Sequence, residues 1–179
     1  MGKLLLRVVQ TVLSLVLVLS CVSCGRARLP ADYRMAAFDA RVSWTVEGLS
    51  VLAVLRADAP VEGARGIRME MISPQTLSGV VLTRQEGQWR VACGELETDA
   101  SLLRELTAFA ELLLPMGEIT PVCETEWQGE TVLYAEIVHN TEEGEKCVYE
   151  LYLDLETGEP RSIRQGERAL EIRSFQALP

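Results

Sequence analysis

The chain has 179 residues, enough for one domain of ordinary size, and 48% of them are hydrophobic, which is enough for a core. Its formal net charge is −9. The first 20 residues carry two positive charges and no negative one, so the rest of the chain carries −11. Such an acidic chain lacks the basic surface that nucleic acids and anionic lipids attract. Composition therefore excludes nucleic acid as a partner, and it excludes global disorder.

The first 20 residues predict a bacterial lipoprotein signal peptide. Two basic residues precede an apolar stretch at residues 8–19, which is too short to span a bilayer comfortably. It ends in Leu-Val-Leu-Ser-Cys, typical of a lipobox with Cys21 as the lipidated residue, and Cys24 is the competing position. We expect residues 21–31 to be a tether whose acyl chains, such as palmitate, anchor the protein at the extracytoplasmic face of the membrane. An ordinary signal peptide or an uncleaved anchor is the alternative.

The first half of the mature chain has the period-2 alternation of β-strands. A short helical turn is expected at residues 32–38, and Gly48 separates two alternating runs that predict a hairpin. Five strands are predicted before residue 98, at residues 41–47, 49–57, 67–71, 80–83 and 89–93.

The period changes at Thr98, where the spacing of apolar residues becomes that of an amphipathic helix. Thr98 or Asp99 is expected to cap its start, and Pro115 with Gly117 to end it. The apolar stripe consists of Leu102, Leu103, Leu106, Phe109, Ala110, Leu113 and Leu114. Its width predicts that the helix covers one face of the sheet.

Strands resume after this helix, at residues 122–127, 131–139, 148–155, 161–164 and 169–175. We therefore predict one domain, residues 32–179, of the α+β class: a curved antiparallel sheet, or unclosed half-barrel, with one main helix packed on its concave face. Residues 147–175 are expected to form the closing edge of that sheet.

The order of these elements resembles the LolA/LolB-like lipoprotein superfamily. The residues that carry the resemblance are 151–160, which read Leu-Tyr-Leu-Asp-Leu-Glu-Thr-Gly-Glu-Pro, the run Phe-Asp-Ala-Arg-Val at 38–42, and Ser-Pro to Gly at 73–79. The resemblance implies an unclosed β-barrel whose concave face is plugged by helices and often holds an apolar cavity. Classical members carry acylated proteins between membranes, and others are anchored extracytoplasmic lipoproteins.

No enzymatic chemistry is predicted. The chain has a single histidine, His139, and no nucleophile motif accompanies it. Cys93, Cys123 and Cys147 are too widely spaced for a zinc site, and a disulfide among them is left open. We expect no cofactor, no metal and no catalytic residue.

The remaining candidate for a binding site is the apolar surface between helix and sheet. The expected lining residues are Met69, Met71, Leu102, Leu106, Phe109, Leu113, Tyr149, Leu151 and Leu153. If they surround a cavity, an acyl chain is the natural ligand, and if they pack tightly they form an ordinary core. The first reading predicts a membrane-anchored lipoprotein that binds lipid or another apolar moiety. The alternative is a structural docking module, with a filled core, for another protein of the cell or spore envelope.

Overall fold

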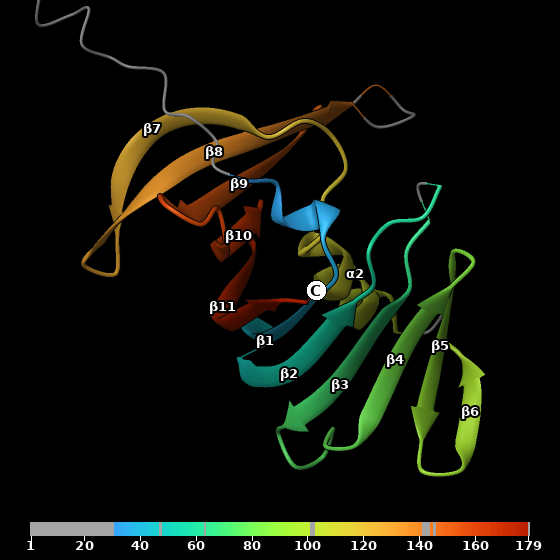
Figure 1. Cartoon of the computed structure of the whole chain (residues 1–179). Coiled ribbons are helices and arrows are strands. Elements are labelled where there is room, and N and C mark those ends of the chain that lie inside the picture. The colour runs from blue at the N-terminus through green and yellow to red at the C-terminus, as the bar shows by residue number, and fades with distance from the viewer. Residues whose placement is uncertain are drawn as a thin grey trace, which may run out of the picture.

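The structure is a computed structural model. It describes residues 31–178 except 47, 63, 101, 102, 141–143 and 145. The predicted signal peptide and both candidate lipidation sites, Cys21 and Cys24, lie outside the described residues. Figure 1 shows the arrangement of the elements.

The described elements are a short 3₁₀ helix, eleven strands and one α-helix. In the first half they are η1 (Tyr33–Met35), β1 (Phe38–Val46), β2 (Leu49–Ala57), β3 (Ile67–Ser73), β4 (Val80–Gln85), β5 (Gln88–Cys93) and β6 (Leu96–Asp99). In the second half they are α2 (Arg104–Leu112), β7 (Thr120–Trp127), β8 (Glu130–Asn140), β9 (Lys146–Asp154), β10 (Pro160–Gln165) and β11 (Arg168–Ala177).

The eleven strands form one open antiparallel sheet in the order β6-β5-β4-β3-β2-β1-β11-β10-β9-β8-β7. Neighbouring strands are consecutive in the chain except at the centre, where β1 pairs with β11 and Phe38 lies opposite Ala177. This pairing joins two meanders into a single sheet, and Figure 1 shows α2 and η1 between its two halves. The sheet stays open because β6 and β7 are not paired with each other.

The hydrophobic core lies on the face of the sheet that α2 covers, because alternate residues of each strand point there. From the strands it includes Val42, Val51, Met69, Leu151 and Ile163, all fully buried. The helix contributes Phe109, whose ring stacks on that of Trp44 with centroids 5.1 Å apart. The apolar faces of the strands and of α2 therefore meet in one cluster, which holds the two halves of the sheet together.

The predicted α+β class is wrong, because the described chain is almost entirely sheet and its α-helix has only nine residues. Thr98 and Asp99, the predicted cap, belong to β6, where Thr98 pairs with Val91 of β5. Helical spacing of leucines shows that a helix exists but not where it begins. The free backbone groups at the edge of β5 bind residues 96–99 instead, and the helix starts later at Arg104.

The ten strands that the sequence predicted are all present, and only β6 was missed. The prediction that residues 147–175 form the closing edge of the sheet is wrong, because β9, β10 and β11 lie inside the sheet and its edges are β6 and β7. Strand order depends on which strand β1 pairs with, and alternation along one strand carries no information on that.

Candidate binding cavity

The side chains that the sequence predicted as the lining of a cavity are in the hydrophobic core. Met69, Met71, Phe109, Leu113, Leu151 and Leu153 are buried there, and Leu106 and Tyr149 pack against them. Leu102 lies outside the described residues. The structure therefore brings these residues together, but none of them is among the residues that line the cavity described next.

That cavity, of about 1040 Å³, lies at one end of the sheet, beside the end of α2. Four segments that are distant in sequence form its walls. They are η1, the β2–β3 loop, the β4–β5 turn, and the loop after α2 at residues 114–117. The volume is of the order that small-molecule sites have in proteins, roughly 300–1,000 Å³.

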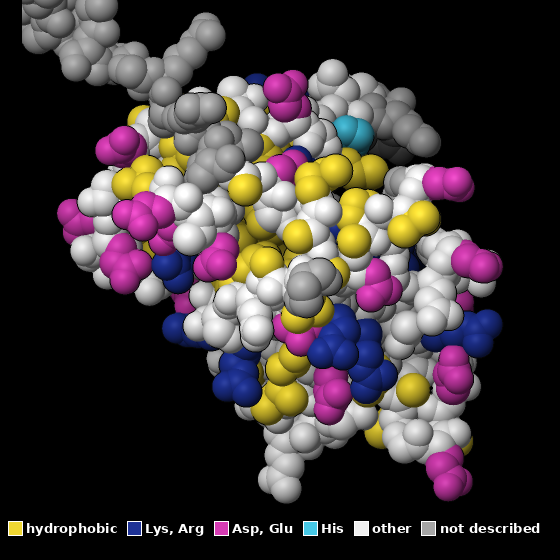
Figure 2. All heavy atoms as spheres, viewed as in Figure 1, with side chains coloured by type: hydrophobic (Ala, Val, Ile, Leu, Met, Phe, Trp, Pro, Cys, Tyr) yellow, Lys and Arg dark blue, Asp and Glu magenta, His cyan; other side chains and the backbone are white. Residues whose placement is uncertain are grey.

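The wall of this cavity carries three exposed apolar side chains. Met35 from η1 is 67% exposed, Val61 from the β2–β3 loop is 70% exposed, and Met116 from the loop after α2 is 73% exposed. A single exposed apolar residue is ordinary on a protein surface, but a group around one opening is typical of a binding site. Figure 2 shows hydrophobic side chains gathered in the middle of this view of the molecule, with acidic side chains around its margin.

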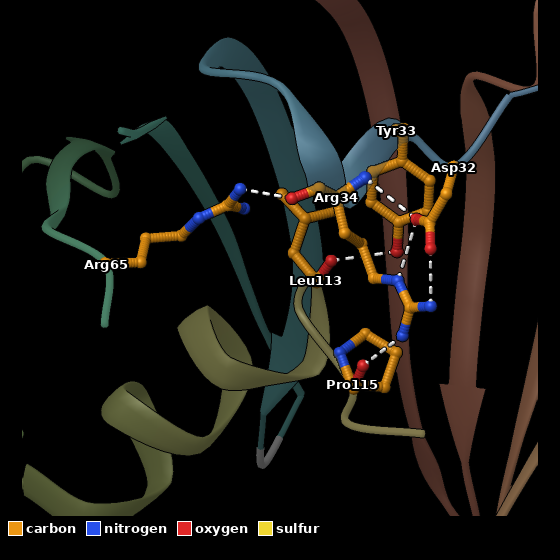
Figure 3. A network of polar contacts seen from close by, with 6 residues as sticks. All are labelled: Asp32, Tyr33, Arg34, Arg65, Leu113 and Pro115. Carbon is orange, nitrogen blue, oxygen red and sulfur yellow. Dashed lines mark hydrogen bonds and ion pairs between the residues drawn. The ribbon is translucent and has the colours of Figure 1, made fainter. Parts of the chain in front are cut away.

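A polar network fixes η1 against the end of α2 (Figure 3). Asp32 caps η1, and its carboxylate accepts hydrogen bonds from the Arg34 backbone amide at 3.0 Å and from Arg34 Nη2 at 2.7 Å. Tyr33 is buried and donates its hydroxyl to the Leu113 carbonyl at 2.9 Å. Arg34 Nη1 donates to the Pro115 carbonyl. Carbonyls at the end of a helix lack intrahelical donors, so η1 supplies the missing partners.

Arg65, from the β2–β3 loop, joins the same network. Its Nη2 donates to the carbonyls of Arg34 and Ala36, the latter at 3.2 Å, and its guanidinium lies 5.8 Å from the centroid of the Phe38 ring. Its Nη1 is buried and has no hydrogen-bond partner in the described structure. Partial burial lowers the pKa of Arg65, although the group stays cationic. This arginine therefore holds η1 through two backbone carbonyls, and one of its buried donors has no partner among the described residues.

The remaining ionisation states in the network follow from the same contacts. Partial burial acts to raise the pKa of Asp32, but hydrogen bonds from the side chain and the amide of Arg34 outweigh it and lower that pKa overall. Burial raises the pKa of Tyr33, so its hydroxyl remains a donor at neutral pH. The network therefore has fixed donors and acceptors over the physiological range, and it serves to hold η1 in place.

The described residues offer little other chemistry. No group of three or more His, Cys, Asp or Glu side chains in the described part of the chain could hold a metal ion. His139 lies opposite Cys147 in the β8–β9 ladder. Cys93, Cys123 and Cys147 are free, and both Cys93 and Cys123 are exposed. None of the helices among the described residues has the length and hydropathy that a membrane span needs.

Sequence reasoning missed the cavity because its parts have no shared pattern. A helical turn was predicted at residues 32–38, and the structure forms it at Tyr33–Met35 only, with Phe38 already in β1. Nothing in the spacing of these residues relates them to Arg65 or to Met116. The loops that carry these residues read as ordinary connectors. An apolar residue beside a glycine or a proline, as Met116 is, was the one local signal, and it is weak.

The fold and the cavity define a class: an open, curved antiparallel sheet with one short helix on one face and a cavity at one end.

No protein-family model matches the sequence, and no curated protein matches it. An uncharacterized conserved protein from Thermus thermophilus is similar in structure, with 16% identity and a TM-score of 0.51, over 82% of this chain and 81% of that chain. MucB is similar with 14% identity and a TM-score of 0.53, over 82% of this chain and 55% of that chain.

A putative outer membrane lipoprotein-sorting protein domain from Vibrio parahaemolyticus is also among the similar structures, with 9% identity and a TM-score of 0.43, over 83% of this chain and 87% of that chain. The similarities to the Thermus thermophilus protein and to MucB, at 16% and 14% identity, show a common fold and nothing further. The predicted resemblance to the LolA/LolB-like superfamily stays a prediction, and no particular family member is indicated.

Proposed function

We propose that this protein is a non-enzymatic, lipid-anchored extracytoplasmic lipoprotein that binds an acyl chain or a similar apolar group in the cavity beside η1. The observation that carries the proposal is the group of exposed apolar side chains, Met35, Val61 and Met116, around a cavity of about 1040 Å³. An extended hydrocarbon chain would cover these side chains and remove apolar surface from water. Arg65, which lines the cavity, adds a positive charge for a carboxylate or phosphate head group.

The test is a titration of the protein with a fluorescent fatty acid, together with native mass spectrometry to detect co-purified lipid. We expect saturable binding, and we expect Val61→Asp and Met116→Asp each to weaken it by about tenfold, since a charge replaces about 1.4 kcal/mol or more of apolar contact. Leu96→Asp is the matched control, because Leu96 is 78% exposed on β6 and is not a lining residue. Absence of saturable binding and of co-purified lipid would exclude the proposal.

The exposed edge of β7 favours a second function, docking of another envelope protein. β7 is the last strand of the sheet, and its Val122 is 51% exposed. An unpaired edge can accept a strand from a partner, with backbone hydrogen bonds supplying the affinity. Crosslinking in cells followed by purification separates the two functions. One stoichiometric protein partner, lost on Val122→Pro, supports docking, whereas extractable lipid without such a partner supports the binding of an apolar ligand.

A further inference from the structure

The three exposed apolar residues of the cavity come from three different segments, and this points to an external surface that they meet together. Met35, Val61 and Met116 lie on η1, on the β2–β3 loop and on the loop after α2. Other large exposed apolar side chains, such as Leu49, lie outside the cavity lining. Exposed apolar side chains gathered from separate loops are typical of a surface that contacts a membrane.

The point at which the described chain begins lies on this same rim. Asp32 lines the cavity, and the bonds from Tyr33 to the Leu113 carbonyl and from Arg34 to the Pro115 carbonyl hold it there. Ala31 lies ten positions after Cys21, which gives a reach of at most roughly 35 Å. A lipid anchor at Cys21 would therefore keep the cavity end of the sheet within about 35 Å of the bilayer.

The charges around the cavity identify the kind of lipid surface. Three arginines and four acidic residues line it, so its own charge is nearly balanced, while the whole chain carries −9. Anionic lipids would not attract such a surface, because electrostatic attraction to them requires an excess of basic residues. Contact must then come from the apolar side chains, and it should be insensitive to salt.

We infer that the rim formed by Met35, Val61 and Met116 rests on the surface of a zwitterionic phospholipid bilayer, so that the cavity opens directly toward the lipid. The inference rests on the lipid anchor of the proposed function, and it names the partner of the same cavity. A ligand would then pass between bilayer and cavity without crossing water, which removes the cost of exposing an acyl chain to solvent.

The experiment uses the full-length lipidated protein reconstituted in phosphatidylcholine vesicles that contain lipids brominated in the upper acyl chain. A tryptophan is introduced as Met116→Trp, with Leu96→Trp as the control, because both positions are more than two-thirds exposed and neither substitution disturbs the core. Trp44, Trp89 and Trp127 supply the same background in both proteins. We expect the Met116→Trp protein to lose emission in brominated vesicles and the Leu96→Trp protein to keep it, equally at low and at high salt.

Equal quenching of the two proteins, quenching of neither, or quenching that disappears at high salt would overturn the inference. The outcomes separate it from the proposed function. Saturable fatty-acid binding without selective quenching at residue 116 overturns the bilayer contact and leaves the ligand site. Selective quenching without fatty-acid binding supports the bilayer contact while the ligand proposal fails.

Discussion

The hydroxyl of Tyr33 connects η1 to the end of α2, and Tyr33→Phe removes that connection alone. The ring stays, and with it the edge contacts to Phe38 and Phe175, at centroid distances of 6.2 and 5.9 Å. What is lost is the 2.9 Å hydrogen bond to the Leu113 carbonyl, which is left without this donor in a buried place. Loss of a buried hydrogen bond with its acceptor left behind costs about 1–2 kcal/mol.

Urea unfolding monitored by circular dichroism measures this cost. For a chain of this size the dependence of the free energy of unfolding on urea is about 2 kcal/mol/M, so the midpoint should fall by roughly 0.5–1 M. Tyr134→Phe is the control, since the Tyr134 hydroxyl donates to Glu136 at 2.7 Å in a half-buried place where water can replace it. A Tyr33→Phe protein as stable as the Tyr134→Phe protein would refute the assigned role of the network.

The pH dependence gives a second check on the same substitution. Burial raises the pKa of Tyr33 in the folded state, so the folded protein holds the proton more tightly than the unfolded chain does. The stability that this provides is complete below the unfolded pKa of about 10 and is lost as the pH rises above it. Tyr33→Phe removes this loss, so the stability difference from the natural protein should shrink above pH ~10. A difference that is constant up to pH ~11 would contradict the assignment.

Two further substitutions test the turns. Asp154 accepts hydrogen bonds from the Thr157 amide of its turn and from the Arg161 side chain of β10, which lower its pKa to about 2. Its stabilisation is therefore complete above the ordinary pKa of about 4 and is lost as the pH falls through ~2. Asp154→Ala should therefore cost about 1–2 kcal/mol at pH 7, allowing for partial solvent screening, and much less at pH ~2 in urea unfolding; a cost independent of pH would contradict this. Gly117→Ala should cost about 2–3 kcal/mol in thermal unfolding, because φ is +115° and the added Cβ would lie 2.8 Å from Ile137 Cγ2. Gly87→Ala, at φ +79° with no atom within 4 Å of the added Cβ, should cost only about 1 kcal/mol, and an equal loss at both sites would show that the contact is unimportant.

The cavity differs in kind from the apolar core that the sequence suggested. Core residues such as Met71 and Leu151 are fully buried and hold the sheet to α2. The cavity is formed by loops and by η1, beside the end of the helix. Substitutions at its rim are therefore expected to change binding with little effect on stability, because exposed side chains contribute little to the folded state.

The sequence by itself determined the strands and the face that each side chain occupies. The alternation that placed Leu151 and Leu153 inward on β9 is confirmed by their burial, and the hairpin predicted around Gly48 is formed, with Trp44 opposite Val51. These features depend on neighbours along the chain, and a period of two residues translates directly into two faces.

Only the tertiary structure decided how the strands are ordered and where the cavity lies. The pairing of β1 with β11, the strand at residues 96–99 and the late start of α2 all depend on which backbone groups are free once the chain has folded. The cavity depends on the same assembly, because Tyr33 and Arg65 reach their partners from segments far apart in the chain. Contacts between distant segments leave no periodic trace in a sequence, so folding alone brings these residues together.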